Sequence, residues 1–465
     1  MLAAGCSDGA RPSSPAPPAA GGETISGRER FGWNQNAATA DELATYRFAV
    51  YVDGVRRLLE GETCASAAGP DGFPCSAPLP PLTAGRHTIE LAAFVTVDGT
   101  VIEGARSEPL HVTVAAATAS AGPANAGPLV SSDGLPLDTS IVVRNLDDPV
   151  DVAVAPGGQV LVAERGGRIR IVDQTAGESI STLGLPRDAE RAELLSIALS
   201  PLFADNGWLY LAVLTTNDTQ TALRVLRGRA AAGTLAEMAE IASHPVHADT
   251  TAVIRFGPDG CLYVGVGAGP EGADAQMLPA FTGKILRLRD DGFTPDGNPW
   301  GSPVWSVGHR DPRGLAWDPR DHALWQVERD DAGDEINRVR AGANYGWPLV
   351  RAGQAHPDVT RPVFVLPAGI ELSGIATVIA PTSPLFGDLI VSAREGQDLL
   401  RIRVDGSRRH QATSRLLLGR FGRMGGVASG PDGSLFAVTA NGDTWGRGAD
   451  LLIRVAPAAR PANKR

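Results

Sequence analysis

Short apolar runs recur along most of this chain, and in many of them apolar and polar residues alternate. Such alternation is typical of β-strands, whose successive side chains point to opposite faces. Turn-forming residues separate the runs, since the 465 residues include 55 glycines and 35 prolines. With an ordinary hydrophobic content of 43%, the pattern predicts an all-β protein of two domains rather than a helical bundle.

The segment 23–115 contains three stretches of alternation, YRFAVYVDG, GRHTIELAAFV and EPLHVTVAA. Gly, Pro and Asp separate them, and Trp33 is a candidate for the core aromatic residue. These features predict a small β-sandwich, and the segment resembles fibronectin type III domains. Residues 116–130 have the composition of a linker.

A longer unit recurs about six times after this linker. It consists of an apolar run, Pro-Asp-Gly or a related turn, and a second apolar run, as in DVAVAPGGQVLVAER, VIRFGPDGCLYVGVG and GVASGPDGSLFAVTA. Each copy is interpreted as a β-hairpin, in which Asp-Gly or Gly-Gly supplies the positive φ of the turn. One hairpin cannot bury its apolar faces alone, but six four-stranded blades around an axis can. We therefore expect a six-bladed β-propeller over 131–457, followed by a tail at 458–465.

The charge of the chain narrows its possible partners. The formal net charge is −10, and no stripe of Lys and Arg offers a binding surface for phosphates, so we expect no nucleic-acid partner. No apolar run approaches the length of a membrane-spanning helix.

The N-terminal residues 1–22 predict export. The sequence LAAGC, which ends at Cys6, matches a bacterial lipobox, although the charged and apolar parts of a signal peptide do not precede it. We expect a longer precursor, lipidation at Cys6, and a disordered tether rich in Ser, Pro and Ala behind it. The protein would then be periplasmic or anchored at the outer membrane of a bacterium, through this lipid alone. The alternative is a chance match in an alanine-rich terminus.

The use of cysteine agrees with an oxidising compartment. Cys64 and Cys75 bracket a short loop that contains no histidine, which favours a disulfide over a metal site. Such a disulfide would stabilise its domain by roughly 2–3 kcal/mol. Cys261 opens an apolar run and is expected to be a buried thiol.

A cluster of charged residues stands at a boundary between two copies of the repeat. The stretch GHRDPRG, residues 308–314, separates the apolar runs PVWSV and GLAW. Loops between blades gather at one mouth of a propeller channel, where sites are commonly built. The cluster is therefore either part of a site or a polar turn that satisfies its own charges.

Several motifs within residues 135–455 resemble the glucose/sorbosone dehydrogenase family of soluble, six-bladed, PQQ-dependent sugar dehydrogenases. They include VLVAERGGRIRIVD, GKILRLRDDGFTPDGNPW, WSVGHRDPRGLAWDP, GDEIN, GANYGWP and FGDLIVSAREGQDLLRIRVDG. The resemblance implies a quinone that receives hydride from a sugar while a base takes the proton of the C1 hydroxyl. It also implies a calcium ion that polarises the quinone, and arginines that bind the carboxylates of PQQ. The implied partner is a small-molecule sugar or a cell-surface carbohydrate.

The position of the family's catalytic histidine is occupied by Asp249 in this chain. His247 lies two residues earlier and is the other candidate for the base. An aspartate is a weak base unless it is buried, so the resemblance leaves both residues as candidates.

The positions implied to hold the quinone are altered. Arg191 replaces the family's glutamine and Glu193 replaces a glycine, so larger side chains surround the cofactor position. Asp311 replaces an asparagine, and its charge would repel an anionic cofactor by about 4 kcal/mol at roughly 4 Å. The resemblance implies cofactor contacts from Arg191, His309, Arg310, Asp311, Arg394 and Arg423.

The implied calcium loop is altered as well. Asp330 and Asp331 replace a Gly-Pro pair whose carbonyl groups bind the metal, and their carboxylates could contribute oxygen ligands instead. The candidate metal ligands are Asp330, Asp331, Asp334, Glu335, Asn344 and Tyr345.

Three functions stay open at this point. The first is a PQQ-dependent aldose dehydrogenase with an unusual site. The second is a non-catalytic propeller that binds carbohydrate or protein, with candidate surface aromatics at Trp300, Trp305 and Trp347. The third is a metal-dependent lactonase or hydrolase that uses Asp249, His247 and His244.

Overall fold

The computed structural model divides the chain into two compact units, Met1–Pro123 and Ala124–Arg465. It describes residues 23–25, 30–59, 62–65, 67–70, 72–79, 85–97, 100–114, 129–173, 179–184, 191–217, 220–231, 234–269, 272–407, 409–442, 446 and 448–458. The predicted lipidation site Cys6, the tether 1–22 and most of the predicted linker and tail lie outside these residues. Within them, no helix is both long enough and apolar enough to cross a membrane.

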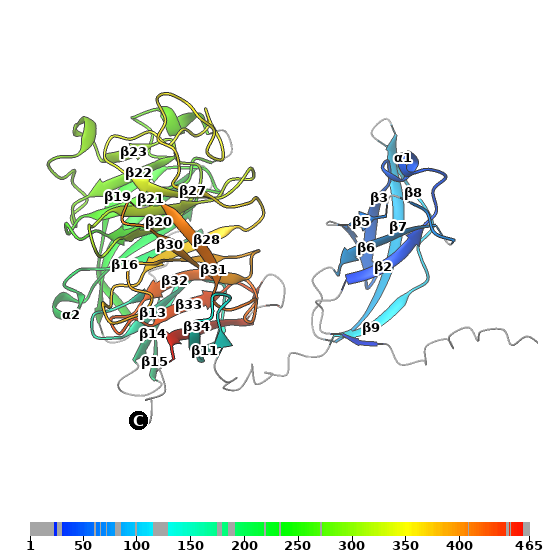
Figure 1. Ribbon diagram of the computed structural model, residues 1–465, viewed down its shortest axis with the longest axis horizontal. Helices are drawn as coiled ribbons and strands as arrows, with labels where there is room; N and C mark the ends of the chain where they lie inside the picture. The colour runs from blue at the N-terminus through cyan, green and yellow to red at the C-terminus, as the bar shows by residue number, and fades with distance from the viewer. Residues whose placement is uncertain are drawn as a thin grey trace, which may run out of the picture. The chain divides into compact units, whose positions relative to one another are not determined.

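The N-terminal unit contains two β-sheets (Figure 1). The larger has the strand order β1-β9-β7-β3-β4, with β8 paired to β7. Its strands are β1 (Glu23–Ile25), β3 (Arg47–Val52), β4 (Val55–Leu58), β7 (Gly85–Val97), β8 (Thr100–Glu103) and β9 (Leu110–Val114). The smaller sheet has the order β2-β6-β5 and consists of β2 (Arg30–Gln35), β5 (Thr63–Cys64) and β6 (Phe73–Pro78), and the short helix α1 (Ala40–Leu43) follows β2.

Apolar side chains of both sheets form the core of this unit. Phe48 and Val50 of β3 pack with Ala77 of β6, and the ring of Trp33 lies 5.0 Å from that of Phe48. Alternation along each strand directs one row of side chains into this core. The predicted β-sandwich is confirmed, whereas its likeness to fibronectin type III domains stays a prediction.

The disulfide between Cys64 and Cys75 is present as predicted. It joins residues that lie directly opposite each other on β5 and β6. Because the two cysteines are separated by 11 positions in the sequence, the bond restricts the unfolded chain over a short loop. Cys261 is a buried free thiol, as expected.

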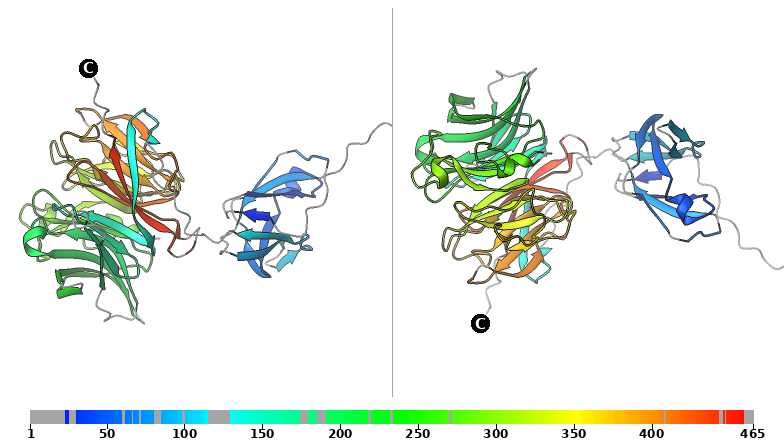
Figure 2. Two further views of the ribbon diagram at one scale, coloured as in Figure 1. Left: turned by 90° about the horizontal axis from the view of Figure 1, so that it is seen from below. Right: turned by 90° about the horizontal axis from the view of Figure 1, so that it is seen from above.

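The second unit consists, over the described residues, of six β-sheets that form the blades of a propeller (Figures 1 and 2). The innermost strands are β12 (Pro149–Val154), β16 (Arg191–Leu199), β20 (Ala252–Phe256), β24 (Pro312–Trp317), β28 (Leu372–Thr377) and β32 (Met424–Ser429). The second strands are β13 (Val160–Glu164), β17 (Trp208–Thr216), β21 (Leu262–Val266), β25 (Leu324–Glu328), β29 (Leu389–Ala393) and β33 (Leu435–Thr439). The third strands are β14 (Arg168–Asp173), β18 (Thr221–Ala231), β22 (Lys284–Leu288), β26 (Glu335–Val339), β30 (Asp398–Val404) and β34 (Asp450–Pro457).

The outer strands are β15 (Ser179–Gly184), β19 (Thr234–Pro245), β23 (Val304–Val307), β27 (Phe364–Val365), β31 (His410–Arg415) and β11 (Pro136–Leu146). The two-residue strand β10 (Leu129–Val130) pairs with β11. Short helical turns lie in the loops: α2 (Phe203–Asn206), η1 (Ala273–Gln276) and η2 (Pro299–Gly301).

The sixth blade closes the ring. Its outer strand β11 precedes the first blade in sequence, yet it pairs with β34 near the C-terminus, from Leu137 opposite Pro457 to Leu146 opposite Asp450. The innermost strands contact one another in the cyclic order β12, β16, β20, β24, β28, β32 and back to β12. The predicted six-bladed propeller is confirmed, and the turn glycines Gly260 and Gly433 have the expected positive φ of 74° and 83°.

The two ends of the propeller carry different loops. We term the end at which the innermost strands begin the entry face, and the opposite end the exit face. Neighbouring strands of each blade are antiparallel, so the loops between second and third strands also lie on the entry face. The residues predicted to bind the quinone or the metal fall on or beside entry-face loops, including Asn344, which pairs with Val307 at the end of β23.

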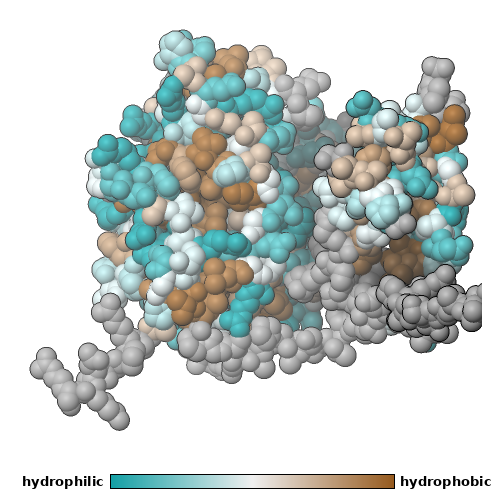
Figure 3. Space-filling model, turned by 45° about the vertical axis from the view of Figure 1, so that its right-hand side comes forward, coloured by the Kyte–Doolittle hydropathy of each residue, from teal (hydrophilic) through white to brown (hydrophobic). Residues whose placement is uncertain are grey.

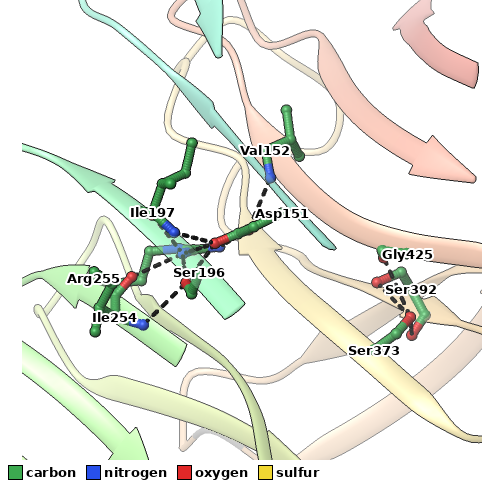
Figure 4. Close-up of polar contacts among 9 residues, drawn as sticks. All are labelled: Asp151, Val152, Ser196, Ile197, Ile254, Arg255, Ser373, Ser392 and Gly425. Atoms are coloured by element: carbon green, nitrogen blue, oxygen red, sulfur yellow. Dashed lines mark hydrogen bonds and ion pairs between the residues drawn. The ribbon is translucent and has the colours of Figure 1, made fainter. Parts of the chain in front are cut away.

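A buried ion pair crosses the innermost strands inside the channel (Figure 4). Arg255 of β20 donates to the two carboxylate oxygens of Asp151 in β12 at 2.7 and 2.8 Å, and Ser196 of β16 donates to the same carboxylate at 2.5 Å. On the opposite side of the ring, the Ser373 hydroxyl donates to the carbonyl of Met424 at 2.8 Å. Beyond these contacts, a cavity of about 600 Å³ is lined by all six innermost strands.

Candidate functional site

The loops that carry the predicted cofactor residues meet on the entry face. The Arg329 amide donates to the carbonyl of Asp311 at 3.1 Å, and its side chain pairs with Glu371 at 2.9 Å. The Arg394 amide donates to the carbonyl of Glu371 at 2.9 Å, and Arg423 forms an ion pair with the residue after Arg394. These contacts join the loops of the fourth, fifth and sixth blades into one surface.

Arg310 pairs with the two aspartates that replace the family's Gly-Pro. Its guanidinium lies 3.2 Å from Asp330 and 2.6 Å from Asp331, and 4.7 Å from the ring centre of Trp347. The Arg351 guanidinium lies 4.9 Å from the same ring and 3.5 Å from Asp330. Guanidinium groups suit such combined stacking and pairing, so the positive charges around Trp347 are compensated within the chain.

Asp311 has a cationic partner other than Arg310. It accepts two hydrogen bonds from Arg313, at 2.6 and 2.9 Å, and one from the Thr251 hydroxyl. Because Thr251 directly precedes β20, this bond attaches the loop of the fourth blade to the third blade. Asp311 is therefore held in place as a paired carboxylate.

A cavity of about 400 Å³ on the entry face lies between the first, second, fifth and sixth blades, and Arg191 and Arg394 contribute to its lining. Arg191 pairs with Glu193 at 2.5 Å. The neighbouring Arg165 pairs with Asp148 at 2.6 Å. The cavity thus contains arginines, but carboxylates lie directly beside at least two of them.

The two candidate bases are exposed in the loop between β19 and β20. The ring of His247 packs on Gly269, where φ is +73° and an added Cβ would lie 2.9 Å from Cδ2 of the ring. The adjacent Ala268 amide donates to the carbonyl of Arg310 at 2.7 Å. The loop therefore brings His247 next to the Arg310 segment, and Asp249 lies two residues further along the same loop.

His244, the third residue of the hydrolase hypothesis, is engaged elsewhere. Its ring packs edge-on against Phe281 with 3.7 Å between the centres, and burial lowers the pKa of His244 to about 4. In the part of the chain that the structure describes, no three side chains of His, Cys, Asp or Glu are grouped so as to hold a metal ion. This arrangement gives the hydrolase hypothesis no geometric support.

The candidate calcium ligands on the loop after β25 bind backbone groups instead of converging. Asp334 accepts the amides of Asp330 and Leu372 at 3.2 and 2.9 Å. Glu335 accepts the amide of Gly353 at 3.0 Å. These carboxylates hold the loops of the fourth blade in place and attach them to β28 of the fifth, and burial raises the pKa of Asp334.

The other candidate ligands point to different partners. The amides of Asn344 and Gln276 donate to each other at 2.7 and 3.1 Å. The Tyr345 hydroxyl donates to the carbonyl of Arg338 at 2.6 Å and accepts the amide of Arg340 at 3.0 Å. The structure therefore does not bring the six predicted calcium ligands together.

His309 lies below the entry face. Its side chain is fully buried, one ring nitrogen is 2.9 Å from the Ser306 hydroxyl and the other is 3.2 Å from Glu328. The ring stacks on Tyr345 at 4.7 Å, and burial lowers the pKa of His309 to about 3. Although it precedes Arg310 in sequence, His309 does not reach the surface on which the resemblance places a quinone.

A buried carboxylate pair beside His309 was not predicted. Burial raises the pKa values of Glu328 and Glu335 to about 8, and the two residues lie directly opposite each other on β25 and β26. Gln326 donates to Glu328 at 2.9 Å, and Asn337 donates to Gln326 at 3.0 Å. The signal in the sequence was the recurrence of polar residues two positions apart within the apolar strands LWQVE and EINRV.

Comparisons with known proteins agree with the propeller and its motifs. The family described as Glucose / Sorbosone dehydrogenase matches residues 146–449. The aldose sugar dehydrogenase of Escherichia coli is 28% identical over 334 residues, which cover 65% of this chain and 90% of that protein. The PQQ-bound aldose sugar dehydrogenase of Streptomyces coelicolor superposes with a TM-score of 0.60 at 29% identity, covering 69% of this chain and 98% of that one. The apo form of the soluble Escherichia coli enzyme superposes with a TM-score of 0.62 at 27% identity, covering 69% and 100%. This chain therefore belongs to the glucose/sorbosone dehydrogenase family.

Proposed function

We propose that this chain is an exported, non-catalytic member of its family, which binds carbohydrate and no longer holds the quinone. The observation that carries the proposal is charge compensation on the entry face. Arg310 and Arg423, two of the arginines expected to bind the cofactor, pair with carboxylates of the chain. Arg191, which replaces the glutamine, is paired in the same way.

The residues present do not fit PQQ and calcium in the family's manner. The carboxylates of PQQ would have to displace Asp330 and Asp331 from Arg310, and Glu193 from Arg191. A carboxylate kept at roughly 4 Å from the cofactor would repel it by about 4 kcal/mol. No group of described side chains offers the metal a ready set of carboxylates, and an exposed aspartate stands at the position of the base.

Surface aromatics support the binding function. Trp300 is 48% exposed, and Trp305 and Trp347 are half-buried. Figure 3 shows apolar patches set among hydrophilic side chains on one side of the propeller. The relatives are named aldose sugar dehydrogenases, and these names give sugars as their substrates. We therefore propose a sugar as the partner of this chain.

One observation favours the alternative, a PQQ-dependent aldose dehydrogenase. His247 packs beside the Arg310 segment, where an imidazole could take the role of the base in place of Asp249. This alternative requires the entry-face ion pairs to open when the quinone binds.

Calorimetry with PQQ in millimolar calcium, combined with aldose-dependent dye reduction, separates the two functions. We expect neither binding nor reduction by the natural chain. A variant that restores family residues, with Glu193→Gly, Asp249→His, Asp330→Gly and Asp331→Pro, is expected to gain PQQ binding. Tight binding and turnover by the natural chain would refute the proposal, and Asp249→Asn and His247→Ala would then identify the base.

Export is proposed from the disulfide and the lipobox. A stable disulfide such as Cys64–Cys75 requires an oxidising compartment. Mass spectrometry of membrane-associated protein should find a lipid on Cys6, and Cys6→Ser should move the protein to the soluble fraction.

A further inference from the structure

The exit face carries a second cavity, of about 310 Å³, between the third and fourth blades. Its lining comes from β21, β23, β24, the turn after β24, the start of β25 and the end of β26. Cavities that hold small molecules measure roughly 300–1,000 Å³, so this one has room for a single small unit. The side chains that give it chemical character are Tyr263, Trp305, Trp317, His322, Arg338 and Arg340.

Three aromatic rings form the wall of this cavity. The ring of Tyr263 meets Trp305 edge-on at 5.7 Å and Trp317 at 5.1 Å, and its hydroxyl donates to Asp259 at 3.0 Å. A Cβ at Gly257 would lie 2.8 Å from the Tyr263 ring and 3.1 Å from the Trp317 ring, so the rings close tightly over that glycine. The aromatic wall is therefore fixed by packing before any ligand arrives.

The cavity is positively charged on an acidic protein. Its lining contains two guanidinium groups and one imidazole but, among the described residues, no carboxylate, although the chain has a net charge of −10. Arg338 pairs with Asp321 outside the lining at 3.3 Å. Within the described residues, no carboxylate forms an ion pair with the exposed Arg340.

The position of these arginines is set by the buried Tyr345. Its hydroxyl binds the backbone of both Arg338 and Arg340, at 2.6 and 3.0 Å. The end of β26 is thus fixed beside the aromatic wall, and it presents the guanidinium of Arg340, for which the described part of the chain supplies no carboxylate.

We propose that this cavity binds an acidic sugar, a hexuronate unit of an oligosaccharide. Aromatic rings offer a flat apolar surface for the C–H face of a pyranose, and a guanidinium binds a carboxylate through charge-assisted hydrogen bonds. A neutral sugar would leave Arg340 without a partner, and a small inorganic anion would leave the aromatic wall uncovered. The inference rests on the proposed carbohydrate-binding function and names its ligand, but it does not involve the entry face.

Titration calorimetry with trigalacturonate and with its methyl ester, which has the same sugar rings without the charges, tests the proposal. We expect the acid to bind and the ester to bind at least tenfold more weakly. Arg340→Gln should weaken binding of the acid about 10- to 100-fold, the range for charge-assisted hydrogen bonds. The matched control is Arg361→Gln, which alters an exposed arginine outside the lining and should bind like the natural chain.

A second variant, Trp305→Leu, should weaken binding of the acid and of the ester, with an unchanged circular dichroism spectrum. Equal binding of the acid and the ester, or unaltered binding by Arg340→Gln, would overturn the acidic-sugar assignment and leave the sugar-binding function standing. Absence of binding by both sugars would reject the assignment for this cavity, and titration with a neutral aldose would then test the sugar-binding function separately. The PQQ titration described above is a separate readout, so failure of the non-catalytic proposal would be recognised independently.

Discussion

The buried pair Glu328–Glu335 predicts how the stability of the propeller depends on pH. Burial raises both pKa values from 4.5 to about 8, so the folded state keeps a proton that the unfolded state releases above pH 4.5. The stabilisation is fully present below pH 4.5 and is lost as the pH rises through 8. The free energy of unfolding should therefore fall with increasing pH.

The interval from pH 6.5 to 8 isolates this effect. Burial lowers the pKa values of His309 and His244 to about 3 and about 4, so both are neutral in the folded state. In the unfolded state they lose their remaining charge just above pH 6.5, an opposing effect of only about 0.4 kcal/mol each. Lys284, with a pKa lowered to about 8, carries its charge over most of the interval. Because the two glutamates lie directly opposite each other in the buried sheet, two negative charges would repel there, and we expect the pair to hold one proton. One proton over 1.5 pH units corresponds to about 2 kcal/mol.

The test substitution is Glu328→Gln, because glutamine has nearly the shape of a protonated glutamate. Its side-chain oxygen can accept the hydrogen bond from Gln326, and its amide group can donate to Glu335. Urea unfolding followed by tryptophan fluorescence reports on the propeller, because only Trp33 of the eight tryptophans lies outside it. We expect the decline of about 2 kcal/mol to disappear in the variant, which should be the more stable protein at pH 8. The exposed Glu240→Gln, which loses only a surface pair with Arg224, should keep the decline. An equal slope in Glu328→Gln and the natural chain would refute the reasoning.

Three further perturbations test the fold. Asp151→Ala leaves the partly buried Arg255 without its partner and should cost about 3–5 kcal/mol, whereas Asp151→Ala with Arg255→Met should cost less in the same urea assay. Reduction of the disulfide, or serine in place of both cysteines, should destabilise the sandwich by roughly 2–3 kcal/mol, measured by hydrogen exchange of the amides in its strands. Gly292→Ala, at φ +89° and with an added Cβ that would collide with the carbonyl oxygen of Ile241, should lower the melting temperature more than Gly297→Ala, at φ +81° in open space, where only the backbone strain of about 1–3 kcal/mol applies.

The blades could be predicted from the sequence because their hairpins are local. An apolar run, a turn that admits positive φ and a second apolar run occur within about fifteen residues, and the hairpin formed by β20 and β21 pairs within that span. The closure of the ring could not be predicted in this way. The partners Leu137 and Pro457 lie at opposite ends of the propeller sequence, and no local pattern identifies such a pair.

Motifs located the site but did not orient its side chains. They placed Arg310 and Asp311 on a loop of the entry face, where the structure has them. The neighbouring His309 turns inward because its ring nitrogens find partners in the core of the fourth blade. A motif fixes the position of a backbone segment, whereas the direction of each side chain depends on groups from other blades.

If, as we propose, the quinone no longer binds, the charges on the entry face need another source of compensation. An arginine that is partly removed from water needs a counter-charge, because an unpaired buried cation is costly. In a site built for an anionic quinone, the cofactor supplies that charge. Here Asp330 supplies it, since its buried carboxylate pairs with the partly buried Arg310. The pairs of Arg310 with Asp331 and of Arg191 with Glu193 each include a largely exposed side chain, so they contribute less. In the function that we propose, a substitution that reads as a loss in the sequence, aspartate in place of the glycine at position 330, provides the counter-charge that a ligand would otherwise bring.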